Sequence, residues 1–206
     1  MPESRSGPQL AIVAGPNGSG KSTFFNTWLK PEFPVFVNAD EVASQLRTVP
    51  ENERNIAAAQ QAEAERERLI GQRTSFAFET VFSRTEYWLR FIQDAKERGF
   101  FIHLFFICTD DPLLNAARVE TRVREGGHSV PVEKISARYP GSIQTAVQAM
   151  GLVDELWLYD NSRLNESARV VAAISAGSLI YRSPGQPRWT EPFFRRFDTP
   201  PGGTDA

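Results

Sequence analysis

The stretch Gly15-Pro16-Asn17-Gly18-Ser19-Gly20-Lys21-Ser22 matches the pattern G-x-x-x-x-G-K-[ST] without a gap. An apolar run at 10–14 precedes it, and a helical pattern from 22 to 29 follows it. Successive backbone N–H groups in such a loop point inward, and the helix N-terminus adds positive potential. The sequence therefore predicts a phosphate-binding loop (P-loop) that takes a nucleoside triphosphate.

The residue types inside this loop predict separate roles. Gly18 and Gly20 permit backbone angles and a close approach that a Cβ would block. Lys21 is expected to reach the β- and γ-phosphates, and the Ser22 hydroxyl to ligate Mg²⁺. The predicted nucleotide site consists of Gly15, Pro16, Asn17, Gly18, Ser19, Gly20, Lys21, Ser22 and Thr23. No base-recognition motif separates ATP from GTP, and the loop at 160–162 is a candidate place for the base.

Apolar runs typical of buried strands alternate with helical patterns along the chain. Strands are predicted at 10–14, 35–38, 75–78, 100–108 and 156–159, with one or two edge strands between 169 and 181. Helices are predicted at 22–29, 51–70, 85–98, 111–124 and 132–150, the last with a break near Pro140-Gly141. This alternation predicts a doubly wound α/β fold with a mostly parallel sheet of five or six strands and helices on both faces.

Composition limits the class of protein. The chain has 206 residues, 41% of them hydrophobic, and a formal charge of -2, which gives no general attraction to nucleic acid or acidic membranes. A single cysteine, Cys108, excludes an internal disulfide, and no segment has the length and apolarity of a membrane span or signal peptide. We therefore expect a cytoplasmic protein without membrane contact.

The chain divides into two predicted parts. Residues 8–183 are expected to form one catalytic domain, and residues 184–206 a tail rich in proline and aromatic residues. The prolines predict an irregular tail, and its aromatic side chains predict that it docks at least partly on the domain. The end from Thr199 is expected to be loose.

Polar residues follow several predicted strands, at the edge of an open α/β sheet where ligands bind. After the second strand, Asp40 is the candidate general base, because phosphoryl transfer to a hydroxyl needs a carboxylate that accepts the proton. The alternative is that Asp40 caps a helix beginning at Glu41. After the fourth strand, Asp110 and Asp111 are interpreted as structural, since Asp-Pro is an ordinary helix start.

Glu79 follows the third predicted strand and has two candidate roles. It could bind Mg²⁺ through water, or it could hold a substrate hydroxyl, and the second interpretation is slightly favoured. Asn38, Thr80 and Arg84 are further candidates for substrate binding at the same edge.

An arginine-rich helix precedes a glycine-rich loop. Arg118 and Arg122 are four residues apart, so they share one helical face and can hold the same phosphates. A cationic helix followed by a glycine hinge is what a closing lid requires, here at about 118–132, with His128 as a substrate contact of the lid. The alternative is a solvated face on which these arginines pair with glutamates.

Five segments in order resemble the zeta-toxin family of P-loop kinases. They are GPNGSGKST from 15, FVNADEVA from 36, SFAFETVFS from 75, RVETRVREGGHSVP from 118 and ISARYPGS from 135. The resemblance implies a shikimate- or adenylate-kinase-like three-layer fold, ATP with Mg²⁺ as donor, a base at Asp40, substrate contacts at Glu79 and Thr80, and charge stabilisation by Arg118.

The same resemblance implies an acceptor and a partner. Zeta toxins phosphorylate the 3′-hydroxyl of the amino sugar of UDP-N-acetylglucosamine, and a small antitoxin protein blocks their nucleotide site. Zeta toxins carry a further arginine in the lid, near the position where this chain reads Gly-Gly-His-Ser-Val-Pro at 126–131. They also have an E-G-T-x-R-like stretch where this chain reads Glu-Thr-Val-Phe-Ser-Arg at 79–84. In zeta toxins both segments lie on the acceptor side. The resemblance therefore supports the fold and the ATP donor more strongly than it supports a UDP-sugar as acceptor.

Three functions are compatible with these motifs. The leading hypothesis is a small-molecule kinase acting on a hydroxyl. The second is a nucleic-acid-end kinase, which nineteen arginines favour but the charge of -2 and the lack of a basic run oppose. The third is a nucleotide-dependent switch without an acceptor, which Asp40 and the paired arginines of the lid oppose.

Overall fold

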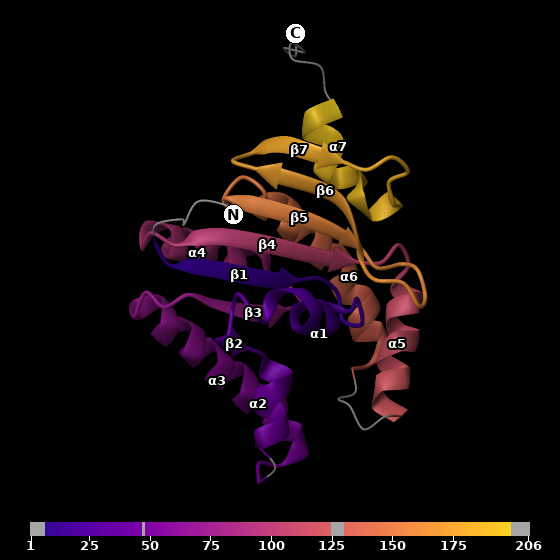
Figure 1. The fold of residues 1–206 in the computed structure, drawn as a ribbon. Helices are drawn as coiled ribbons and strands as arrows, with labels where there is room; N and C mark the ends of the chain where they lie inside the picture. Colours follow the sequence, from indigo (N-terminus) through magenta and orange to yellow (C-terminus); the bar gives the residue numbers. More distant parts are fainter. Residues whose placement is uncertain (1–6, 47, 125–129, 199–206) are drawn as a thin grey trace.

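The computed structural model describes residues 7–46, 48–124 and 130–198 and contains a seven-stranded sheet (Figure 1). The strand order is β2-β3-β1-β4-β5-β6-β7. The first five strands pair in parallel, whereas β6 and β7 add an antiparallel hairpin. The strands are β1 (Gln9–Ala14), β2 (Phe36–Val37), β3 (Phe76–Thr80), β4 (Phe101–Cys108), β5 (Glu155–Asp160), β6 (Arg169–Ser175) and β7 (Ser178–Arg182).

Helices lie on both sides of this sheet, with α1 in front and α4 and α6 behind in Figure 1. The predicted α/β class with a mostly parallel sheet is thereby confirmed. The helices are α1 (Lys21–Phe24), η1 (Phe25–Leu29), α2 (Ala39–Gln45), α3 (Glu51–Gly71), α4 (Thr85–Glu97), α5 (Pro112–Arg124), α6 (Val132–Ala149), η2 (Arg188–Thr190) and α7 (Glu191–Asp198). Among the described residues, no helix is both long and apolar enough to cross a bilayer.

The alternation of side chains along β1 separates two cores. Leu10 and Ile12 belong to the larger core, together with residues of α3, α4 and α6, whereas Ala11 and Val13 pack under α1 and η1. All four side chains are fully buried. Strand β1 is therefore covered on both faces, which is why its sequence is continuously apolar.

Three local predictions differ from the structure. The helix predicted at 22–29 is split into α1 and a π-helical segment, η1. The break predicted near Pro140 does not occur, because α6 continues through it with the loss of one backbone donor. The sheet has seven strands where five or six were predicted, because two edge strands, β6 and β7, form in the segment where one or two were predicted.

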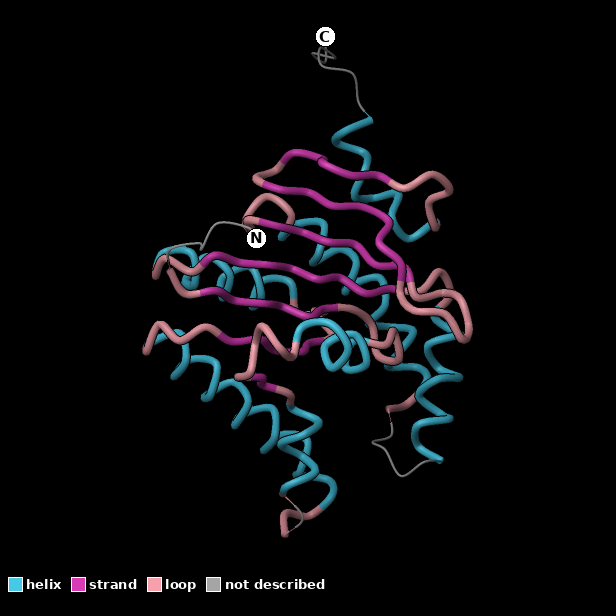
Figure 2. Tube along the Cα trace, in the orientation of Figure 1, coloured by secondary structure: helices cyan, strands magenta, loops and turns pink. Residues whose placement is uncertain are grey.

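The tail is more ordered than its prolines predict. Residues 188–198 form η2 and α7, and Trp189, Phe193 and Phe194 join the larger core. The ring centroids of Trp189 and Phe193 lie 5.8 and 5.9 Å from that of Phe106 on β4. Figure 2 shows this segment beside the β6–β7 hairpin, at the end of the sheet opposite α2 and α3. Residues 199–206 lie outside the described part of the chain.

Candidate active site

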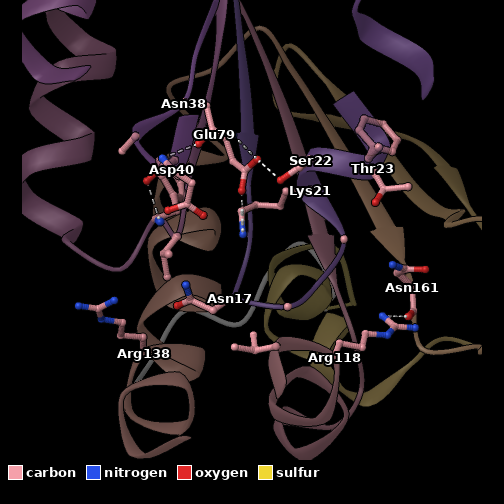
Figure 3. Close-up of a pocket in the computed structure, with 18 of the residues that line it drawn as sticks. Asn17, Lys21, Ser22, Thr23, Asn38, Asp40, Glu79, Arg118, Arg138 and Asn161 are labelled. Carbon is pink, nitrogen blue, oxygen red and sulfur yellow. Dashed lines mark hydrogen bonds and ion pairs between the residues drawn. The ribbon is translucent and has the colours of Figure 1, made fainter. Parts of the chain in front are cut away.

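A cavity of about 1010 Å³ opens at the carboxyl ends of the parallel strands. One end is formed by the P-loop and by the segment after β5, and the other by α3, the β3–α4 connection and Arg138 of α6. Figure 3 shows Asn161 on one side of this space and Arg138 on the other. The cavity is large enough for two small molecules side by side.

Glu79 lies at the centre of the phosphate end. Its Oε2 accepts hydrogen bonds from the Ser22 hydroxyl at 2.6 Å and from Asn38 Nδ2 at 3.3 Å. The register explains this placement, because β3 runs beside β1 and Glu79 is level with Val13, just before the P-loop. The structure thus joins Glu79 to the predicted magnesium ligand Ser22, on the donor side of the cavity.

Lys21 is buried beside the same carboxylate. Its Nζ donates to the carbonyl of Pro16 at 2.9 Å and lies 3.7 Å from Glu79 Oε1. Burial lowers the pKa of Lys21, and the charges of Glu79 and Asp40 oppose that effect. A cation is therefore held in the loop at the place where phosphate oxygens would bind.

Asp40 lies beside Asn38 and Glu79, in the first turn of α2 (Figure 3). The helix cap is Asn38, whose Oδ1 accepts a hydrogen bond from the backbone N–H of Asp40 at 2.9 Å. The alternative in which Asp40 caps this helix is therefore wrong. The Asp40 side chain is 54% exposed, and its Oδ2 lies 3.9 Å from Nη1 of Arg122.

Arg118 lines the cavity but contacts backbone carbonyls in this structure. Its Nη1 donates to the carbonyl of Asn161 at 2.9 Å, and its Nη2 donates to that of Arg163 at 3.4 Å. Burial lowers the pKa of Arg118, opposed by the charge of Asp160. Arg118 would have to leave these carbonyls to reach a transferring phosphoryl group.

The remaining predicted substrate residues divide between two places. Thr80 and Arg84 line the cavity, where the Thr80 hydroxyl accepts a hydrogen bond from the N–H of Phe82 at 3.0 Å. The Arg84 guanidinium lies 4.4 Å from the centroid of the Tyr87 ring. His128 lies outside the described residues, as does the rest of the segment 125–129 within the predicted lid at about 118–132.

The acidic pair after β4 lies away from the cavity. Asp111 Oδ1 accepts a hydrogen bond from the backbone of Leu113 at 2.8 Å, and Asp110 Oδ1 accepts one from the backbone of Trp189 at 3.3 Å. These contacts begin α5 and attach the C-terminal segment to the domain.

Two residues of this site were not predicted from the sequence, Arg66 and Arg138, which line the cavity from α3 and α6. Asn161, in the loop predicted as a candidate place for the base, donates from Nδ2 to the carbonyl of Ser19 at 2.8 Å within the P-loop. Arg66 lies in a stretch that reads as an ordinary charged helix.

Two glycines of the P-loop, Gly15 and Gly20, have no room for a side chain. A Cβ on Gly20, whose φ is +95°, would lie 2.4 Å from Asn161 Nδ2. A Cβ on Gly15, whose φ is +145°, would lie 2.0 Å from the carbonyl oxygen of Ile107. The second contact involves backbone in a central strand, so it cannot be relieved by a side-chain rotation.

We therefore expect Gly15→Ala to lower the free energy of unfolding by about 2–4 kcal/mol, from backbone strain and overlap together. Equilibrium denaturation in urea measures this change. Gly71→Ala is the matched control, because no atom lies within 4 Å of the added Cβ. The control should be neutral or stabilising by up to ~1 kcal/mol. Equal stability of the two variants would contradict the P-loop geometry described above.

The donors present suit one kind of metal. A hydroxyl and a carboxylate side by side, as in Ser22 and Glu79, fit the hard, oxygen-preferring Mg²⁺ when phosphate oxygens and waters complete its shell. Within the described ranges, no group of three or more His, Cys, Asp or Glu side chains could hold a metal by itself. A metal here would therefore be bound together with a nucleotide.

Comparison with known proteins identifies a domain family. Residues 10–138 match the family model AAA_33, an AAA domain. An uncharacterized protein of Haemophilus influenzae is 32% identical over 130 residues, which cover 62% of this chain and 90% of that protein.

Solved structures share the fold at low identity. A chain of the AvrRxo1-ORF1:-ORF2 complex with ATP superimposes with a TM-score of 0.68 at 18% identity, covering 84% of this chain and 60% of that one. A chain of the PezAT chromosomal toxin–antitoxin system of Streptococcus pneumoniae gives 0.61 at 16% identity, covering 94% and 81%. This chain thus spans about 60% of the AvrRxo1 chain, and these likenesses concern the fold.

Proposed function

This chain belongs to the AAA_33 family of AAA domains, and we propose that it is a kinase that transfers the γ-phosphoryl group of ATP to a hydroxyl of a small molecule. The observation that carries this proposal is the placement of Asp40. Its side chain lines the same cavity as the buried Lys21 and the Ser22–Glu79 pair, so a candidate base lies beside a phosphate site. A nucleotide switch would not need that carboxylate.

The donor half would act by binding and charge stabilisation. P-loop N–H groups and Lys21 would hold the β- and γ-phosphates, and Ser22 would hold Mg²⁺ with Glu79 beside it. Bound Mg²⁺ supplies neutralisation of charge on the phosphate oxygens. We assign Glu79 to this metal rather than to a substrate hydroxyl, because its Oε2 already accepts from Ser22.

The acceptor half would supply the proton acceptor. The acceptor hydroxyl oxygen attacks the γ-phosphorus, its proton passes to the Asp40 carboxylate, and the bond from the γ-phosphorus to the β,γ-bridging oxygen breaks to release ADP. Arg122 is near enough to Asp40 to hold the carboxylate or the transferring group. Arg118 would contribute to the same charge after leaving the Asn161 carbonyl.

The first acceptor to test is a UDP-N-acetylamino sugar. Its support is the resemblance of five sequence segments to zeta toxins. Mass spectrometry of products from ATP, Mg²⁺ and a panel of UDP-sugars should show a sugar carrying one added phosphoryl group, absent with Asp40→Asn. Release of free phosphate with every sugar unchanged would exclude this acceptor, and other metabolites and nucleic-acid ends would be tested next.

The zeta-toxin resemblance also supports a small inhibitory protein as partner. If the protein is a toxin of this kind, its expression should arrest growth only while Asp40 is intact. Growth arrest by Asp40→Asn as well would argue against toxicity through phosphoryl transfer.

A further inference from the structure

We infer that Arg66 is the receptor for an oxyanion, a phosphate or a carboxylate, on the acceptor molecule. The assignment of this oxyanion to an acceptor molecule rests on the proposed function, but the existence of the anion site does not. Arg66 comes from α3, at the end of the cavity away from the P-loop. Two observations support this inference: the Arg66 guanidinium is buried, and the nearby carboxylates do not neutralise its charge.

Arg66 is held in an aromatic enclosure. The residue is only 8% exposed, and its guanidinium carbon lies 5.3 Å from the ring centroids of both Phe78 and Trp88. Nη2 donates to the Tyr87 hydroxyl at 3.2 Å, while Nε has no hydrogen-bond partner. Two rings and one hydroxyl therefore orient the guanidinium without neutralising it.

The carboxylates around the cavity are engaged elsewhere. Asp40 faces Arg122, Glu79 is bound to Ser22 and Lys21, and Glu63 interacts with the Tyr87 hydroxyl. In the described part of the chain, no carboxylate forms an ion pair with Arg66. Its charge is compensated only indirectly, through Tyr87.

A buried charge without a counter-ion is costly to the folded state. Such a group is retained where a ligand supplies the missing charge, and a guanidinium presents parallel N–H donors that match the two oxygens of a carboxylate or phosphate. Two other cavity-lining arginines, Arg84 and Arg138, likewise have no ion pair within the residues described here. Three cations from three segments thus surround the acceptor end.

The melting temperature of Arg66→Met distinguishes an anion-binding role of Arg66 from a purely structural one. If the guanidinium only supports Phe78, Trp88 and Tyr87, then Arg66→Met should lower the melting temperature. If Arg66 instead binds an anion, then Arg66→Met without ligand should have the same melting temperature as the wild type or a higher one, because a desolvated charge has been removed. Arg68→Met is the matched control, since Arg68 is exposed on the same helix and pairs with Glu65 at 2.6 Å.

The test is thermal unfolding of protein saturated with Mg²⁺ and a non-hydrolysable ATP analogue, which occupies the P-loop. Inorganic phosphate, acetate and chloride are added at equal ionic strength. An anion that binds the native state raises its melting temperature by mass action. We expect phosphate or acetate to do so in the wild type and in Arg68→Met, to do so partly in Arg66→Lys, and to have no such effect in Arg66→Met.

The two anions distinguish the sources of the oxyanion. A shift with phosphate alone assigns a phosphorylated acceptor, and a shift with acetate alone assigns an acidic one. No shift beyond chloride in the wild type, or the same shift in Arg66→Met, overturns the inference. A lower melting temperature of Arg66→Met without ligand, combined with an unchanged anion effect, would establish the structural role instead.

Kinetics separate this inference from the proposed function. Once an acceptor is identified, Arg66→Met should raise its KM by about 10- to 100-fold, as expected for one lost charged hydrogen-bonding group, with the KM for ATP unchanged. If no acceptor is ever phosphorylated, the thermal test still decides whether the anion site exists. An anion effect without transfer would reject the kinase while keeping the site.

Discussion

Asp40→Asn is expected to lower the turnover number for phosphoryl transfer by about 10²- to 10⁴-fold, the usual contribution of a positioned general base. The amide keeps the size of the carboxylate but cannot accept the proton of the acceptor hydroxyl. Because the Asp40 side chain is 54% exposed, ATP affinity should change by less than about threefold, the effect of a weak exposed charge interaction. Turnover with the identified acceptor and calorimetric titration with ATP measure the two quantities.

The matched control for this variant is Glu41→Gln. Glu41 is the next residue of the same first helical turn and is exposed, so it loses the same charge near the same helix N-terminus. The control should leave turnover nearly unchanged. If Asp40→Asn instead lost as much ATP affinity as a variant of Lys21, then Asp40 would belong to the nucleotide site and the role of base would be wrong.

Lys21→Met is expected to weaken both ATP binding and phosphoryl transfer. The Lys21 ammonium is the buried cation of the P-loop and lies where the β- and γ-phosphates would bind. Loss of a charged donor should weaken ATP binding by about 10- to 100-fold. Turnover should fall by about a further 10²- to 10³-fold, since the same charge stabilises the transferring group. Titration with ATP and single-turnover kinetics separate the two losses.

Lys30→Met, a loss of charge at an exposed lysine after the π-helical segment, is the control for Lys21→Met and should change neither ATP affinity nor turnover.

The pH dependence of ATP affinity offers a second check on the role of Lys21. Burial lowers the pKa of Lys21, so its charge is lost at a lower pH than that of a free lysine. Wild-type affinity for ATP should therefore fall as the pH rises through this pKa. A variant without Lys21 should lack that fall, and a similar fall in Lys21→Met would assign it to another group.

The nucleotide side of the site could be predicted because its geometry is local. Residues 9–24 form a strand, a turn and a helix start in direct succession, so the loop's residue pattern and its flanking elements can be recognised from one stretch of sequence. The position of Asp40 also followed from sequence, since it lies just past a strand that ends at the ligand-binding edge. Parallel pairing brings all such ends together.

The acceptor side could not be predicted in the same way. Whether Glu79 faces a metal or a substrate depends on the register of β3 against β1, and the structure joins it to Ser22. Arg66 looks like any charged helical residue until α3 packs its face against Trp88 and Phe78. The sequence of α3 is only weakly amphipathic, so its pattern does not show which side of this helix is buried.

The amino-acid sequence by itself therefore determined the α/β class, the P-loop and the strand-end position of Asp40, because each depends on contacts between near neighbours. Only the tertiary structure decided that Glu79 contacts Ser22, that Asn161 contacts the P-loop and that Arg66 is buried against Phe78 and Trp88. Those features join segments far apart in the chain. Their formation depends on the packing of whole helices and strands, and the free energy of that packing depends on several distant segments together rather than on any single stretch of residues.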